Sequence, residues 1–84
     1  MQENNFKTKY VLEINDPEDK GCVVAVFDSS MPFMSISVGD FVNTAMFEEA
    51  NRLGVLKVTR VEHLLWEIKE ITTHKICVYT EKQK

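Results

Sequence analysis

The sequence predicts a mainly β domain with one short helix, folded as a small, strongly bent antiparallel sheet or a partly open barrel. Apolar and polar residues alternate through most segments, which is the two-residue period of a strand with one buried face. Only one stretch has helical spacing. A glycine–aspartate pair interrupts the alternation, and such a kink lets a short sheet bend sharply enough to close. The alternative fold is an open α+β sandwich with the helix on one face.

Length and composition predict one globular domain over residues 1–84, with residues 1–6 and 81–84 flexible. The 84 residues are 44% hydrophobic, which suffices for one core and not for two. A net charge of −3 gives no long-range attraction to phosphates or anionic lipids. The polar first ten residues lack a signal-peptide core, and no apolar run is long enough to cross a membrane. We therefore expect a cytoplasmic protein in which Cys22 and Cys77, both within apolar runs, are reduced core thiols.

The first half of the chain has the pattern of a hairpin followed by a bent strand. Residues 7–15 alternate between an apolar and a polar face, as in a half-buried strand. Residues 22–28 are apolar on both faces, as in a central strand, and the polar segment 15–21 forms the turn between the two. Residues 33–38 resume the alternation, and Gly39-Asp40 makes a kink before the chain re-enters the sheet.

One helix is predicted between residues 43 and 54. Asn43 or Thr44 can cap its start, Arg52 lies in its last turn, and Gly54 follows it as the usual terminating glycine. Such a short helix is not stable alone, so we expect it to pack on the sheet or to plug one end of a barrel. Its apolar stripe consists of Ala45, Met46, Phe47, Ala50 and Leu53.

The second half predicts a long strand over residues 55–68, a turn at 69–73 and a last strand at 74–80. The phase of the apolar residues slips within the long strand, which predicts a bulge near Thr59-Arg60 or a bend near Glu62-His63. We expect the in-phase residues Leu64, Trp66 and Ile68 to face the core. The partly open barrel built from these strands would be of the SH3-like or OB-like kind.

Support for catalysis or metal binding is weak. The only histidines, His63 and His74, lack metal-ligand spacing. Pairing of the last two strands could bring them together, and Glu62, Glu67 or either cysteine could then join them. A nucleophile elbow and a glycine-rich phosphate loop are both absent. We expect no cofactor, so a small metal-dependent or hydrolytic enzyme is the least favoured function. The acidic residues of the first turn do not match a calcium loop and are expected in solvent: Asp16, Glu18 and Asp19.

Nucleic-acid binding by a small barrel is a second hypothesis. Lys7 and Lys9 share one face of the first strand, and Lys57 and Lys75 occupy outward positions elsewhere. An exposed aromatic residue beside them would provide a stacking surface. Glutamates are interspersed with these lysines, however, and mixed charge is typical of an ordinary solvated sheet face.

The favoured hypothesis is a non-catalytic interaction module, structural or accessory, that binds itself or another protein. A second apolar stripe runs opposite Trp66, because Leu65 points away from it together with Val61 and His63. If the helix does not cover this stripe, it forms a contact patch of the kind that marks a protein interface. Tyr79 extends the stripe on the last strand and Phe33 widens it. The candidate interface is therefore Phe33, Val61, His63, Leu65, Trp66 and Tyr79.

Overall fold

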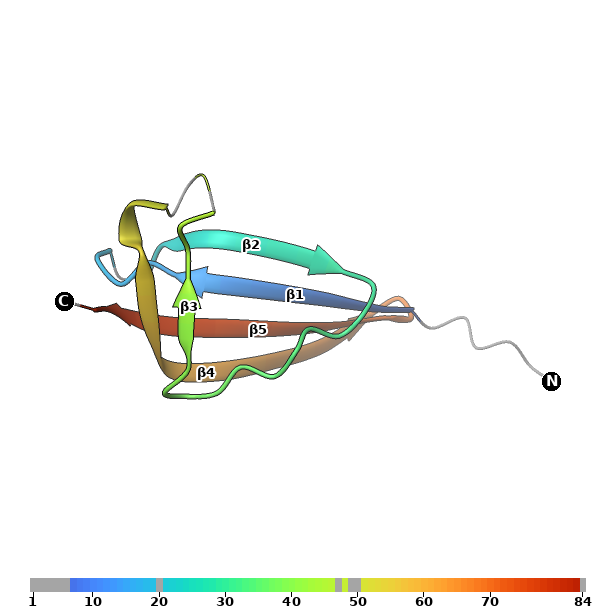
Figure 1. Cartoon of the computed structure of the whole chain (residues 1–84). Helices are drawn as coiled ribbons and strands as arrows, with labels where there is room; N and C mark the ends of the chain where they lie inside the picture. The colour runs from blue at the N-terminus through green and yellow to red at the C-terminus, as the bar shows by residue number, and fades with distance from the viewer. Residues whose placement is uncertain (1–6, 20, 47, 49–50, 84) are drawn as a thin grey trace.

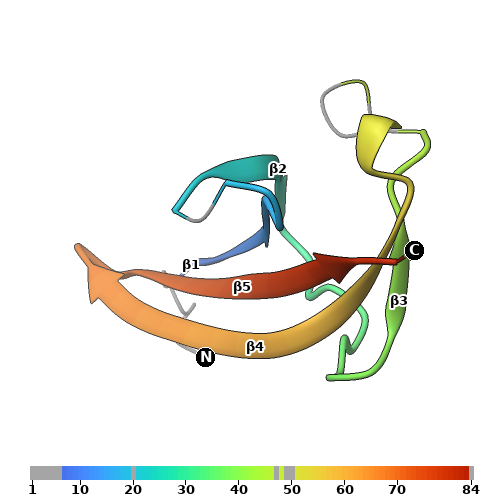
Figure 2. The same cartoon turned by 90° about the vertical axis from the view of Figure 1, so that its left-hand side faces the viewer.

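The computed structural model describes residues 7–19, 21–46, 48 and 51–83. In this part of the chain one five-stranded mixed sheet, in the order β2-β1-β5-β4-β3, curls into a half-barrel, as Figures 1 and 2 show from two sides. The prediction of a mainly β, barrel-like fold is therefore confirmed. The strands are β1 (Lys7–Asn15), β2 (Val23–Ser29), β3 (Phe41–Asn43), β4 (Val55–Ile68) and β5 (Ile71–Lys82), so β5 includes Glu81 and Lys82 of the segment predicted to be flexible.

One strand pair departs from the predicted antiparallel arrangement. β1 and β5 run parallel, in a continuous register from Lys7 opposite Ile71 to Ile14 opposite Val78. The other three pairs are antiparallel. Alternation along a sequence reports which face of a strand is buried and carries no information about the direction in which two distant strands meet. The expectation of a purely antiparallel sheet was wrong for this reason.

The hydrophobic core fills the concave side of the curl. Two clusters of buried residues meet there, and both join side chains from strands that are not neighbours in the sheet. Leu56, Val58 and Val78 have no exposed surface. Burial of such side chains is the main stabilising contribution, at about 1.5–3 kcal/mol each. The buried cluster residues are Leu12, Ile14, Ala25, Leu53, Leu56, Val58, Ile76 and Val78.

The segment predicted as a strand over residues 33–38 is a loop. No strand lies between Ser29 and Phe41, and Figure 1 shows this loop crossing from the end of β2 to β3. Phe33 and Ile36 pack against the core, whereas Met34 and Val38 are exposed. The residues of this segment that contact the core are therefore three positions apart, and not two as in a strand. The Gly39-Asp40 kink itself is confirmed, with Gly39 at a φ of 97°.

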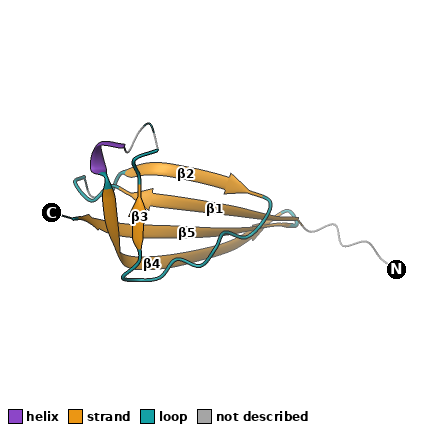
Figure 3. Cartoon of the chain, viewed as in Figure 1, coloured by secondary structure: helices purple, strands orange, loops and turns teal. Residues whose placement is uncertain are grey.

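The predicted helix is also absent from the described residues. They contain only the short 3₁₀ helix η1 (Asn51–Leu53), drawn in purple in Figure 3, while Phe47, Glu49 and Ala50 lie outside the described residues. Pairing of Asn43 with Val55 holds the two ends of this segment together. The buried Thr44 completes the closure by donating its N–H and its hydroxyl to the Gly54 carbonyl, at 2.9 and 2.6 Å. A ten-residue helix would separate its ends by about 15 Å, which this closure does not permit.

The predicted bulge at Thr59-Arg60 is confirmed and decides which face of β4 is buried. The register of β4 against β5 shifts between Val58 and Arg60, so that Val58 and Val61 both contribute to the core. Beyond the bulge, Trp66 therefore lies on the convex face and is 41% exposed. The prediction that Leu64, Trp66 and Ile68 face the core was wrong, because the extra residue of the bulge moves these positions to the face opposite that of Leu56 and Val58.

Candidate functional site

The free edge of strand β4 is the most distinctive surface of the described chain. β3 covers that edge only from Val55 to Lys57. The next backbone contacts are two hydrogen bonds of 2.8 Å, from the Gly39 N–H to the Val58 carbonyl and from the Val58 N–H to the Asp40 carbonyl. From Thr59 to Ile68 no strand among the described residues pairs with this edge. The outer backbone groups of this stretch are therefore available to another strand.

The geometry of the hairpin shows which backbone groups point outward. Lys69 and Glu70 form a two-residue turn, with φ values of 51° and 67°, and Ile68 lies opposite Ile71. Residues that flank such a turn exchange both of their backbone hydrogen bonds, so those of Ile68 point toward β5. Because the direction alternates along an antiparallel strand, the outward groups belong to the alternate residues Glu67, Leu65, His63 and Val61.

Exposed apolar side chains lie beside this edge on both faces of the hairpin. Leu65, on the concave face, is 68% exposed, and Ile68, on the convex face, is 61% exposed. Leu64, Trp66 and Ile71 extend the convex patch and are each more than one third exposed. A long exposed edge strand with apolar residues is a template for pairing with another chain. We call residues 59–68 of β4, with these side chains, the β4 edge.

The structure divides the predicted interface residues between different environments. The β4 edge carries four of them, Val61, His63, Leu65 and Trp66, with Trp66 on the convex face and the others on the concave face. Phe33 instead packs against the core from the loop. Tyr79 is half-buried on β5, where the Arg60 guanidinium lies 4.5 Å from the centre of its ring. The six residues therefore do not form one continuous stripe.

The four lysines of the nucleic-acid hypothesis lie on the convex side. Lys7 and Lys9 are exposed on β1, and the register places Thr73 between Lys9 and Trp66. Lys75 is bound by Glu13 at 2.9 Å, which raises the pKa of the lysine because the carboxylate stabilises its charged form. Lys57 lies near β3, opposite Phe41 and Glu81. Lys9 thus lies two strands away from the exposed tryptophan, and Lys75, which is nearer to it in the register, is already paired with Glu13.

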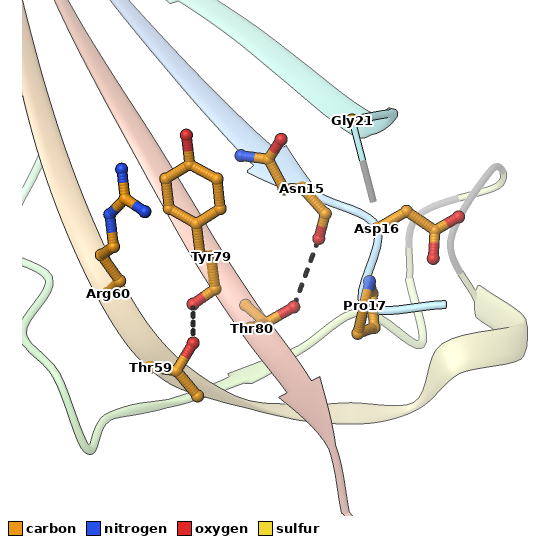
Figure 4. A pocket seen from close by; sticks show the side chains of 8 residues that line it. All are labelled: Asn15, Asp16, Pro17, Gly21, Thr59, Arg60, Tyr79 and Thr80. Atoms are coloured by element: carbon orange, nitrogen blue, oxygen red, sulfur yellow. Dashed lines mark hydrogen bonds between the residues drawn. The ribbon is translucent and has the colours of Figure 1, made fainter. Parts of the chain in front are cut away.

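A hollow of about 370 Å³ lies where the end of β1 approaches the β4 bulge (Figure 4). Its charged lining residues already have partners: Arg60 pairs with Glu62 at 3.2 Å, and Asp16 pairs with Arg52 at 3.1 Å. The Tyr79 hydroxyl also donates to Glu62. A charged ligand would therefore have to replace an existing ion pair. The lining consists of Asn15, Asp16, Pro17, Gly21, Thr59, Arg60, Tyr79 and Thr80.

Asp16 is only 8% exposed, so the expectation that the acidic residues of the first turn lie in solvent was wrong for this residue. Its carboxylate accepts hydrogen bonds from the Glu18 N–H at 2.8 Å and from the Arg52 guanidinium. These two interactions, with the N–H bond contributing more, lower the pKa of Asp16 despite its burial. Glu18, which is exposed as predicted, pairs with Arg52 at 2.9 Å and with Lys82 at 3.0 Å.

The two cysteines have different environments. Cys77 is buried, as predicted, and burial raises the pKa of its thiol. Cys22 is exposed, contrary to prediction, because it precedes β2 in the turn. Its thiol donates a hydrogen bond of 3.2 Å to Asp19, and this carboxylate raises the pKa of Cys22 by disfavouring the thiolate.

Comparison of the chain with models of protein families, with curated proteins and with solved structures finds no match in any of the three. Among the described residues, no helix has the length and apolar character needed to cross a membrane. The same residues contain no group of three or more histidines, cysteines, aspartates and glutamates arranged to hold a metal ion.

Proposed function

We propose that this protein is an interaction module that self-associates by pairing the β4 edges of two copies. The observation that carries the proposal is the absence of a strand partner beside β4 from Thr59 to Ile68 in the described chain, together with exposed apolar residues on both faces. Antiparallel pairing of two identical edges has twofold symmetry, which is the commonest symmetry of homodimers. It would join two half-barrels into one continuous sheet.

Two contributions would stabilise such a pair. The outward N–H and carbonyl groups of Val61, His63, Leu65 and Glu67 would exchange water for backbone partners. Leu65, Trp66 and Ile68 would also lose exposed apolar surface against the partner copy, at about 25 cal/mol per Å². Edge strands in stable monomers are normally protected by charge, by proline or by a covering segment. The acidic and basic side chains in this stretch are Arg60, which pairs with Glu62, and the exposed Glu67.

The test compares a proline with an alanine at one outward position. Glu67→Pro removes a backbone N–H that no strand of the described residues uses, whereas Glu67→Ala removes the side chain and keeps that N–H. We expect the parent chain and Glu67→Ala to be dimers by size-exclusion chromatography with light scattering, and Glu67→Pro to be a monomer. Circular dichroism of all three proteins checks that the sheet is retained.

A second pair of variants tests the apolar contribution. Leu65→Lys places a charge in the centre of the proposed contact, while Met34→Lys places the same charge on a residue that is 87% exposed in the loop between β2 and β3. We expect Leu65→Lys to dissociate the dimer and Met34→Lys to leave it intact. A parent chain that is monomeric at high concentration would overturn the proposal.

Single-stranded nucleic acid is the alternative partner. The specific observation in its favour is that Lys9 and exposed Trp66 lie on one face, separated by Thr73 in the register. Such an arrangement can combine phosphate contacts with base stacking. Binding of a labelled oligonucleotide at low salt, weakened by Lys7→Glu with Lys9→Glu and by added salt, would support this alternative. Absence of binding at low salt would remove it.

A further inference from the structure

The only two histidines of the chain contact each other on the concave face, beside the β4 edge. His63 Nδ1 lies 2.9 Å from His74 Nε2, and the two rings are nearly parallel, with their centres 5.1 Å apart. His63 comes from β4 and His74 from β5, so the hairpin brings together residues that are eleven positions apart. The two imidazoles are separate from the proposed edge pairing, in which His63 takes part through its backbone groups alone.

The surroundings support the ring of His74 and leave the pair accessible. The rings of Tyr10 and His74 meet edge to face, with their centres 6.0 Å apart. Ile76, opposite His63 in the register and on the same face of the sheet, is buried beside the pair. His63 is exposed and His74 is half-buried, so an ion from solvent can reach the facing nitrogens. Strands β4 and β5 therefore hold the two imidazoles next to each other, so that one ion can contact both.

We propose that His63 Nδ1 and His74 Nε2 chelate one divalent transition-metal ion of the imidazole-binding group, Cu²⁺, Ni²⁺ or Zn²⁺. Neutral imidazole is the commonest nitrogen ligand for these ions. Two nitrogens at right angles around a metal, each about 2.0–2.1 Å from it, lie about 2.9 Å apart, whereas tetrahedral ligands lie about 3.4 Å apart. The distance between the facing nitrogens equals the first value, the arrangement that Cu²⁺ and Ni²⁺ adopt. Ring centres 5.1 Å apart show that the two nitrogens now point at each other in a hydrogen bond, so the exposed ring of His63 has to turn before both lone pairs converge on a metal.

Binding requires one proton to move within the pair. In the hydrogen-bonded state one facing nitrogen carries a hydrogen and the other accepts it. When the metal binds, that hydrogen is transferred to the far nitrogen of the same ring through solvent, so that both facing nitrogens present lone pairs. Each ring stays neutral, and no oxidant or reductant is involved. Water completes the coordination, because no third protein ligand is grouped with the pair among the described residues.

The test uses Ni²⁺ for affinity and Zn²⁺ to locate the ligand atoms. Isothermal titration with Ni²⁺, which does not oxidise thiols, should give one site per chain. His63→Gln and His74→Gln should each weaken binding by about tenfold or more, because a single imidazole loses the chelate. Glu62→Gln is the matched control, since it changes a neighbour of His63 that faces the opposite side of β4.

Nitrogen-15 spectra of the histidine rings give a readout that does not depend on variant folding. Addition of Zn²⁺ should shift the resonances of His63 Nδ1 and His74 Nε2 together. A shift in only one ring, or an unchanged affinity in His74→Gln, would overturn the proposal. Loss of binding in Cys22→Ser would also overturn it, because it would place the metal at the exposed thiol and Asp19 instead.

Discussion

Asp16 and Arg52 form an ion pair of 3.1 Å across 36 positions of the sequence. The contact ties the turn between β1 and β2 to the short helix η1, which immediately precedes β4. Asp16 is 8% exposed and Arg52 is about half exposed, so the carboxylate depends on its partners more than the guanidinium does. The pair therefore links the β1–β2 side of the sheet to the β3–β4 side, close to the buried Leu53.

Replacement of Asp16 should destabilise the fold. Asp16→Ala removes the acceptor of both the Glu18 N–H and the Arg52 guanidinium, and we expect a loss of about 1–3 kcal/mol in the free energy of unfolding. Asp16→Asn should lose less, because an amide oxygen still accepts from the N–H. Urea unfolding measures both, with Asp28→Ala on the exposed side of β2 as a control expected within about 0.5 kcal/mol of the parent. An Asp16→Ala variant as stable as this control would contradict the assignment.

Acid should remove the contribution of Asp16 to the free energy of unfolding. The pKa of this carboxyl lies below its usual 3.8, so its ionised form is favoured by folding. The resulting stability is fully present above the unfolded-state pKa and is lost as the pH falls through the folded-state pKa. The difference in unfolding free energy between the parent and Asp16→Asn should therefore be largest near neutral pH and shrink below about pH 4. A difference that stays constant from pH 7 to pH 3 would contradict this reasoning.

Substitutions in the turn of the β4–β5 hairpin should stabilise the protein. Lys69 and Glu70 both have positive φ, a conformation that costs an ordinary side chain about 1–2 kcal/mol and costs glycine almost nothing. Glu70→Gly, alone or with Lys69→Asn, should therefore raise the free energy of unfolding by about 1 kcal/mol. Glu81→Gly, within β5, is the comparison: there the glycine should be neutral or destabilising. Thermal unfolding of the three variants shows whether glycine raises the stability at position 70 and fails to raise it at position 81.

The two thiols should differ in reactivity. We expect one thiol, Cys22, to react with a disulfide reagent in the native protein, and Cys77 to react only on unfolding. Asp19→Asn should accelerate the reaction of Cys22 at neutral pH, because it removes the carboxylate that raises the pKa of that thiol. The rate in Asp28→Asn should equal that of the parent. Equal reaction of both thiols in the native state would show that β5 is not buried as described.

Sequence patterns predicted local features well and long-range relationships poorly. The strands over residues 7–15 and 55–68, the Gly39-Asp40 kink and the bulge at Thr59-Arg60 follow from local spacing, and the structure has all four. The proximity of His63 and His74 was open in the sequence, because it depends on the hairpin register. No pattern in the sequence indicated that Asp16 pairs with Arg52, since the two residues are 36 positions apart.

By itself, the sequence determined that the chain forms a curved sheet, because a two-residue period can bury an apolar face only as a strand. The tertiary structure decided the parallel pairing of β1 with β5. It decided as well that the described residues between Asn43 and Val55 contain only the short 3₁₀ helix η1 in place of the expected helix. It also decided that Trp66 lies outside the core and that one edge of β4 lacks a strand partner in the described chain. Each of these depends on contacts between distant segments, and such contacts override local propensity because packing supplies most of the free energy of folding.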